Sequence, residues 1–322
     1  MPGPTWIEGY IALGVVYDGC MGRCLVALAV LCACNAHLGG TNDHTATTDG
    51  SPGGGTDGGS NMQMTDAAVA LGPWGTPAPV TGAASATVSE DDPTLSSDGL
   101  QLYYAVAQSG GGKKLYEMTR ATRTDAFANP TVLAALNGGT NNEGPRLAYD
   151  DLTIYWGEDG DIYSATRATT SSAWSVVGKV PGVDTTGYEK WLAVCGDGSH
   201  FIVSRDIGDA NGQDLYEGTL GAGAGTRIDT VSSTASEIST FVSKDCLTLY
   251  FASNRIAAND TQIFMSTRTT VGGTWSAPTQ APSPFDGGTD NEDPGYTPDN
   301  RLFVFATTRG GNGTKDVYLS TR

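Results

Sequence analysis

The sequence is poor in the residue groupings from which most enzyme active sites are built. Three histidines occur among 322 residues, and only His200 lies beyond the Gly-rich front of the chain. No Gly-x-Ser-x-Gly segment and no cluster of histidines and cysteines follows that front. Hydrolase triads and zinc sites need such groupings, so the sequence predicts no catalytic residue set of these kinds.

Clustered positive charge and long apolar runs are also lacking. The formal net charge is -17, and the 18 basic residues are scattered singly. Nucleic-acid binding needs grouped Lys and Arg against phosphates, so we expect no nucleic-acid partner. Glycine is abundant, with 44 residues, while charged residues make up only 16%. This balance is typical of turn-rich β architecture rather than of a helical bundle.

One short apolar run near the front has the layout of an export signal. Arg23 precedes residues 25–31, and Leu31-Cys32-Ala33-Cys34 then places a small residue before a cysteine. The run is too short to span a bilayer stably. Residues 1–33 are therefore predicted to be a signal region, with translation starting at Met21. The alternative is a buried helix with incidental cysteines.

Leu31-Cys32-Ala33-Cys34 resembles the bacterial lipobox, and this resemblance implies that Cys34 becomes the lipid-modified first residue of the mature protein. Residues 34–73 are rich in Gly, Thr, Asp and Ser, and cannot bury enough apolar surface to become ordered. We expect a disordered tether there, followed by one folded domain over residues 74–322. The expected location is the outer membrane or cell surface, facing the periplasm or the exterior, with membrane contact through the lipid anchor alone.

Five copies of one sequence pattern occur within the folded domain. Each copy has an acidic residue, a small loop, an Asx turn and an alternating apolar strand. The copies are spaced 52, 46, 48 and 55 residues apart, and they begin at Asp91, Glu143, Glu189, Glu237 and Glu292. This period is typical of four-stranded propeller blades. The sequence therefore predicts an all-β, five-bladed β-propeller.

The last copy is incomplete, which predicts how the ring closes. The fourth strand of a blade opens with an aromatic residue, as at Trp275, but the chain ends at Arg322 without one. Trp74 stands 17 residues before the first copy, as Trp275 stands 17 residues before the last. We therefore expect residues 74–80 to form the missing strand of the last blade, which removes open sheet edges.

The repeats resemble the TolB-type propeller repeat, a relative of the WD-repeat propellers. The resemblance rests on Thr297-Pro298-Asp299-Asn300-Arg301-Leu302-Phe303 and on Asp316-Val317-Tyr318, and it covers about residues 74–322. It implies a propeller of the kind that serves as a docking platform or periplasmic scaffold. A TolB amino-terminal domain and a peptidase domain are both lacking, and five blades depart from the six of TolB, so no Tol-Pal role is carried over.

The five acidic residues are the candidate ligand site. If the copies are equivalent, closure would arrange five carboxylates around one mouth of the central channel: Asp91, Glu143, Glu189, Glu237 and Glu292. Oxygen ligands suit a hard cation such as calcium. The alternative is that each acid accepts backbone hydrogen bonds or pairs within its own blade interface, because repeat proteins reuse the same local bonds.

An enzymatic alternative also remains. Five-bladed propellers of the arabinanase type place three carboxylates in the channel, two of them as acid and base or nucleophile. Catalytic carboxylates need environments that separate their pKa values, whereas these five occupy repeated positions.

Two cysteines near the same turn of adjacent copies are candidates for a disulfide. An exported compartment favours a bond between Cys195 and Cys246, and the alternative is two buried thiols.

Together these features predict a monomeric, lipid-anchored binding or scaffold module for an envelope protein or a glycan. Calcium is the one cofactor considered.

Overall fold

The protein is described by a computed structural model covering residues 71–322, in which one short 3-10 helix, η1 (Ala134–Leu136), accompanies twenty β-strands. The predicted signal region 1–33, the lipidation residue Cys34 and the tether up to residue 70 lie outside the described residues. Within residues 71–322, no helix is long and apolar enough to cross a membrane.

The strands form five antiparallel sheets of four strands each. The first blade comprises β2 (Glu90–Leu95), β3 (Gln101–Ala107), β4 (Lys113–Thr119) and β5 (Ala128–Val132). The second comprises β6 (Asn142–Leu147), β7 (Thr153–Glu158), β8 (Asp161–Thr166) and β9 (Ser175–Lys179). The third comprises β10 (Tyr188–Val194), β11 (His200–Asp206), β12 (Gln213–Thr219) and β13 (Thr226–Arg227). The fourth comprises β14 (Glu237–Val242), β15 (Thr248–Ala257), β16 (Asp260–Thr267) and β17 (Thr279–Gln280). The fifth comprises β18 (Asn291–Tyr296), β19 (Leu302–Thr307), β20 (Asp316–Thr321) and β1 (Ala78–Pro79).

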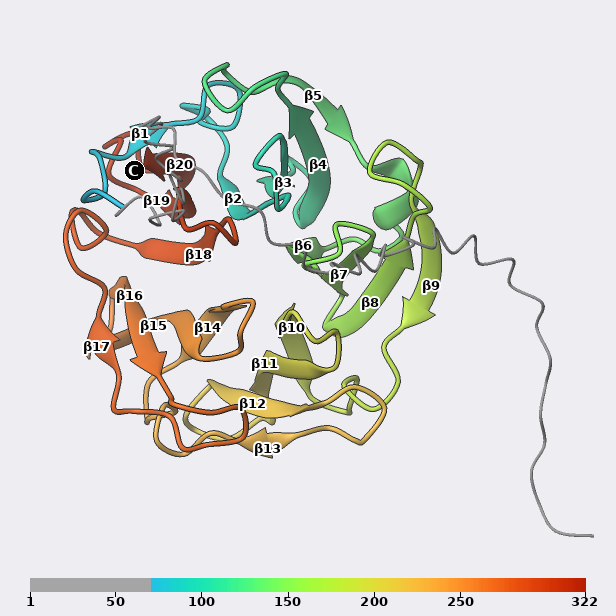
Figure 1. The fold of residues 1–322 in the computed structure, drawn as a ribbon, viewed down its shortest axis with the longest axis vertical. Helices are drawn as coiled ribbons and strands as arrows, with labels where there is room; N and C mark the ends of the chain where they lie inside the picture. Colours follow the sequence, from blue (N-terminus) through green and yellow to red (C-terminus); the bar gives the residue numbers. More distant parts are fainter. Residues whose placement is uncertain (1–70) are drawn as a thin grey trace, which may run out of the picture. The chain divides into compact units, whose positions relative to one another are not determined.

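The five sheets surround a central axis. Figure 1 shows the first strand of each blade nearest the centre, namely β2, β6, β10, β14 and β18, with the later strands farther out. The predicted all-β, five-bladed propeller is confirmed. Apolar side chains fill the space between blades, as where Tyr103 and Leu115 of one blade cluster with Ile154 and Trp156 of the next.

The amino-terminal segment closes the ring as predicted. β1 pairs with β20, with Ala78 opposite Leu319, so the fourth strand of the last blade comes from the front of the domain. The Gly75 N–H donates to the Thr321 carbonyl at 2.8 Å, which extends the contact beyond β1. The guanidinium of Arg322 stacks 4.1 Å from the ring centre of Trp74. Chain closure therefore uses both hydrogen bonds and a cation–π contact.

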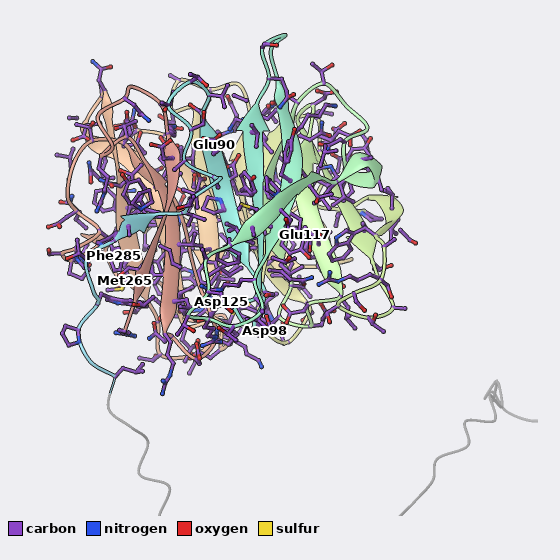
Figure 2. All side chains as sticks on the ribbon, turned by 90° about the horizontal axis from the view of Figure 1, so that it is seen from above. Glu90, Asp98, Glu117, Asp125, Met265 and Phe285 are labelled. Carbon is purple, nitrogen blue, oxygen red and sulfur yellow. A yellow bond between two sulfur atoms is a disulfide. The ribbon has the colours of Figure 1, made fainter. Side chains whose placement is uncertain are left out.

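The propeller has two chemically different ends. At one end, which we call the turn end, an Asx turn joins the first two strands of each blade; the Asp98 carboxylate, for example, accepts from the Leu100 N–H at 2.9 Å. At the opposite end lie the acidic residues that begin the repeats, and we call it the carboxylate end. Figure 2 shows Glu90 at the carboxylate end and Asp98 with Asp125 at the turn end.

Candidate functional site

Every innermost strand carries a β-bulge at the same place near the carboxylate end. The pairing register shifts by one residue there in all five blades. The bulged residues have left-handed backbone angles, with φ between 51° and 60°: Asp92, Gly144, Trp191, Ser239 and Asp293. A bulge bends its strand and redirects side chains, so these residues determine what lies on the axis.

The bulges show that the five predicted acids are not equivalent. The residue immediately before the bulge is Asp91, Glu143 and Glu292 in three blades, but Lys190 and Ile238 in the other two. Glu189 and Glu237 stand one residue earlier, level with Glu90. A shift of one residue moves a side chain to the other face of a strand. The expected ring of five carboxylates is therefore replaced by three carboxylates, a lysine and an isoleucine.

Glu189 and Glu237 instead brace the loops that enter their blades. Glu189 pairs with Arg205 at 2.8 Å, and Glu237 pairs with Arg255 at 2.9 Å. Both glutamates are fully buried. The Glu237 carboxylate also accepts from the Ser233 N–H at 2.8 Å. This matches the alternative interpretation, in which the acid supports its own repeat.

The three acids before the bulges each contact a lysine ammonium. Nζ of Lys113 lies 2.8 Å from Asp91, Nζ of Lys190 lies 2.6 Å from Glu143, and Nζ of Lys315 lies 2.7 Å from Glu292. Lys113 also lies 3.2 Å from Asp92 and 3.6 Å from Glu143. The carboxylates are thus neutralised by the protein's own cations. Among residues 71–322, no group of three or more His, Cys, Asp or Glu side chains is arranged to hold a metal ion.

Side chains from all five blades cross the axis beneath these pairs. The Trp191 indole N–H donates to Asp92 at 2.6 Å, and the Asp92 backbone N–H donates to Asp293 at 3.0 Å. Nε of Arg146 donates to the Thr240 carbonyl at 2.9 Å, and the Thr240 hydroxyl donates to the Trp191 carbonyl. These five buried residues form what we call the axial network, which closes the channel at the carboxylate end.

Neighbouring aspartates in this network have opposite pKa shifts. Burial, followed by the charge of Asp92, raises the pKa of Asp293 well above its usual value. Burial and Asp92 also raise the pKa of Asp91 to about 7. Burial alone would raise the pKa of Asp92, but Lys113 and the hydrogen bonds from Asp293 and Trp191 bring it below its usual value. The surroundings therefore favour the ionised form of Asp92 and the protonated form of Asp293.

Acidic and basic side chains are paired around the axis. Lys113, Lys190 and Lys315, all partly exposed, each contact a buried carboxyl group, that of Asp91, Glu143 or Glu292. Pairing matters because an uncompensated buried charge is costly.

The turn end has a recess on the axis, which we call the axial funnel. It encloses about 20 Å³, and its walls include Leu95, Leu147, Tyr149, Phe241 and Tyr296. Arg146 lines its inner end and is 3% exposed. Nε and Nη1 of Arg146 donate to backbone carbonyls, whereas Nη2 is buried without a protein acceptor. The walls of the funnel thus combine apolar side chains with the polar groups of Thr94, Ser97 and Tyr149.

A more polar hollow adjoins the axial funnel. This polar recess, of about 460 Å³, is lined by Ser243, Lys244, Asp245 and Asn300, and it shares Tyr296 and Pro298 with the funnel.

Cys195 and Cys246, at the same end, form a disulfide with their Cα atoms 5.2 Å apart, joining the third and fourth blades. His200 contacts Asp197 there and is partly exposed.

Sequence reasoning missed a recurring Arg–aromatic pair. The guanidiniums of Arg120, Arg167 and Arg268 stack about 4 Å from aromatic rings seven residues later, at Phe127, Trp174 and Trp275. The sequence does carry a signal for these pairs, namely the constant spacing of seven residues between the arginine and the aromatic residue. Nε of Arg268 also donates to the Cys246 carbonyl at 2.8 Å, so each pair supports the turn of its own blade.

No protein-family model matches this chain, and no curated protein matches it. Solved structures share its fold. A thermostable family-43 glycoside hydrolase is 13% identical with a TM-score of 0.53, covering 76% of this chain and 91% of that one. The catalytic domain of a GH62 α-L-arabinofuranosidase from Coprinopsis cinerea is 14% identical with a TM-score of 0.50, covering 77% and 96%.

TolB from Acinetobacter baumannii also matches, at 15% identity and a TM-score of 0.46, over 73% of this chain. The match spans 55% of the TolB chain, about half of its length. The family-43 and GH62 matches show a shared fold alone at these low identities, so activity has to be argued from this chain's own residues.

Proposed function

We propose that this protein is a non-catalytic binding module of the cell envelope, held to a membrane through a lipid on Cys34, whose turn end binds a protein or a glycan. The observation that carries the proposal is the contrast between the two ends. At the carboxylate end, lysines occupy the acids and the axial network crosses the channel. At the turn end, the axial funnel and the polar recess adjoin one another.

Burial argues against catalysis by the acids. Asp91, Asp92 and Asp293 are at most 5% exposed, and Lys113 contacts both Asp91 and Asp92. A glycosidase needs an acid and a base that flank a sugar, with space for the ring between them. Here a lysine ammonium occupies the place next to the two aspartates.

The second candidate function is glycoside hydrolysis of the arabinanase type. One observation favours it, namely that the pKa of Asp91 is raised to about 7 while that of adjacent Asp92 is lowered. Opposite shifts of this kind are what an acid and base pair requires. The solved relatives named above include two glycoside hydrolases of the same fold.

A hydrolysis assay separates the two candidates. The full-length chain and its Asp91→Asn variant would be incubated with arabinan, arabinoxylan and a chromogenic α-L-arabinofuranoside between pH 4 and pH 8. We expect the same background release from both proteins. Release by the parent chain that falls about 100-fold or more in the variant would establish the hydrolase instead, because that loss is typical of a catalytic group.

A crosslinking experiment tests the binding face. A photoreactive amino acid would replace Pro298 at the turn end, and Gly110 at the carboxylate end, in cells that produce the full chain. Both positions are exposed, and no atoms lie within 4 Å of a side chain added at Gly110. Crosslinked products from position 298 alone are expected. Equal products from both positions, or products from position 110 alone, would show that the turn end is not the binding face.

A further inference from the structure

Two recesses between neighbouring blades have the same construction. The first outer groove, of about 570 Å³, lies between the first and second blades, and the second outer groove, of about 420 Å³, lies between the third and fourth. Glu117 of β4 and Glu217 of β12 occupy the same position in the two grooves. Figure 2 shows Glu117 between the two ends of the propeller. The grooves share no lining residue with the axial funnel or the polar recess.

The following blade completes each groove with the tryptophan of an Arg–aromatic pair. Trp174 lines the first outer groove and Trp275 lines the second, and each ring is stacked on its arginine, Arg167 or Arg268. At the other three blade boundaries, the position of the glutamate is taken by an uncharged residue, namely Ser164, Met265 or Leu319. The glutamate and the tryptophan therefore occur together at two boundaries of the five.

Each glutamate uses only part of its capacity to accept hydrogen bonds. Oε1 of Glu117 accepts from Nε2 of Gln101 at 3.1 Å and from the Tyr103 hydroxyl at 3.0 Å. Glu217 accepts from both members of the Arg–Trp pair beside it, from the indole N–H at 2.9 Å. A carboxylate has about four acceptor positions. Both glutamates are partly exposed, so each can accept further hydrogen bonds from the hydroxyl groups of a ligand.

The arginines that line the grooves are already engaged with the protein, which favours an uncharged ligand. All three guanidinium nitrogens of Arg167 donate to protein acceptors at 2.9 Å. In the second outer groove, Arg227 pairs with Asp214 at 2.8 Å and with Asp229 at 2.7 Å. A phosphate, sulfate or carboxylate is bound by cations that can turn their N–H groups toward it. An anion entering either groove would instead meet a glutamate.

The lining of each groove combines hydroxyl groups with apolar surface. Thr170 and Ser171 contribute hydroxyls to the first outer groove, as Thr226 and Thr274 do to the second. Carbon atoms come from the tryptophans and from aliphatic side chains such as Val132, which is 46% exposed. A sugar ring has the matching chemistry, since its hydroxyls both donate and accept and its C–H face packs against an aromatic ring. Both volumes lie within the range of about 300 to 1,000 Å³ that is usual for small-ligand sites.

The repetition of the groove indicates a ligand whose units also repeat. A folded protein partner presents a given surface once, whereas a polysaccharide presents the same unit many times. Two like sites on one domain raise its overall affinity for such a polymer without any new contact. We therefore infer that each outer groove binds a segment of a neutral polysaccharide. The inference goes beyond the proposed function, because it places two sites outside the axial funnel and the polar recess.

Equilibrium dialysis of the full-length chain in detergent tests the inference. The neutral probes are radiolabelled cellotetraose, xylotetraose and mannotetraose. Tetragalacturonate is the anionic counterpart, and tetra-alanine with blocked ends is the peptide counterpart. We expect at least one neutral tetrasaccharide to occupy two sites per chain, one in each groove. Both counterparts should bind about tenfold or more weakly, a difference of about 1.4 kcal/mol.

Three results of the dialysis would overturn the inference: saturation at one site per chain, tighter binding of either counterpart, or no binding of any neutral tetrasaccharide. The proposed function is tested separately, because the crosslinking position 298 does not line either groove.

A threonine at one equivalent position in the blades provides matched variants. Thr119 and Thr219 are exposed in the two grooves, and Thr166 is exposed at the same position of the second blade, where Ser164 replaces the glutamate. Thr119→Trp or Thr219→Trp should remove one of the two sites, and the double variant should remove both. Thr166→Trp should leave two. Thermal melting checks that each variant is folded. Two sites remaining in a folded double variant would show that the tetrasaccharide binds outside the grooves.

Discussion

At the residue scale, two aspartates in equivalent bulges have pKa values shifted in opposite directions. Asp92 and Asp293 both have left-handed backbones, with φ of 56° and 55°, a conformation that asparagine tolerates as well as aspartate. Substitution by asparagine therefore removes the ionisable group while largely preserving the backbone. This makes the pair a matched test of the charge balance on the axis.

We expect Asp92→Asn to lower the free energy of unfolding by about 3 to 5 kcal/mol, because it removes a buried carboxylate that contacts partly buried Lys113 and buried Trp191. Asp293→Asn should change it by no more than about 1 kcal/mol, because burial and the charge of Asp92 raise the pKa of Asp293 and favour its neutral form, which the amide resembles. Urea denaturation of both full-length variants provides the measurement. Equal losses in the two variants would show that Asp293 is ionised in the folded protein.

The raised pKa of Asp91 leads to a separate prediction about how the free energy of unfolding depends on pH. Its folded pKa is raised to about 7 by burial and by Asp92, above the value of about 3.9 expected in an unfolded chain. The folded state therefore binds more protons between these values, and the contribution of Asp91 to stability is lost as pH rises through 7. Asp91→Asn should make stability depend less on pH between 5 and 8. A pH profile as steep as that of the parent chain would assign the dependence to other groups.

At the element scale, closure depends on a very short strand. β1 contains two residues, Ala78 and Pro79, so its hydrogen bonds alone cannot explain how it holds the last blade. Trp74 adds packing against Phe285 and Phe303 and a cation–π contact with Arg322. The strand is thus fastened mainly by the aromatic residue that precedes it.

Trp74→Ala should consequently lower the free energy of unfolding by about 2 kcal/mol or more, from lost aromatic packing and the lost cation–π contact. Deletion of residues 74–80 should have a larger effect, since it also exposes the edge of β20. Val177→Ala is the control, because Val177 lies on the outer strand β9 and is 67% exposed. Chemical denaturation that cannot distinguish Trp74→Ala from this control would rule out closure through Trp74.

At the scale of the whole molecule, the sequence predicted the number of blades and their closure because both depend on features that repeat along the chain. Each blade has an Asx turn and an apolar strand at a regular spacing, and Trp74 occupies the place that Trp275 has in its own blade. The Asx turn and the apolar strand depend on neighbouring residues within one copy, so both can be recognised in one copy and then found in the other four.

The axial site could not be predicted in the same way. Aligning the copies by acidic residues made Glu189 equivalent to Glu143, whereas the bulge makes Lys190 equivalent to Glu143. Left-handed positions filled by Trp191 or Ser239 leave no glycine to mark them. Nor does the sequence around Arg146 indicate that its guanidinium reaches a carbonyl in the fourth blade. These features depend on contacts between repeats, which a comparison of single repeats does not contain.

The anchor prediction concerns the part of the chain outside the described residues. A formal net charge of -17 gives the protein no attraction to an anionic membrane surface, so the proposed attachment depends on the lipid at Cys34. Each buried methylene of an acyl chain contributes about 0.8 kcal/mol, and stable anchoring needs more than one chain.

We therefore expect Cys34→Ala to move the full-length protein from the membrane fraction to the soluble fraction and to abolish labelling by a radioactive fatty acid. Cys24→Ala, which changes a cysteine earlier in the predicted signal, should leave both unchanged. If the Cys34→Ala protein remained labelled and sedimented with membranes, the lipid would be attached at another residue.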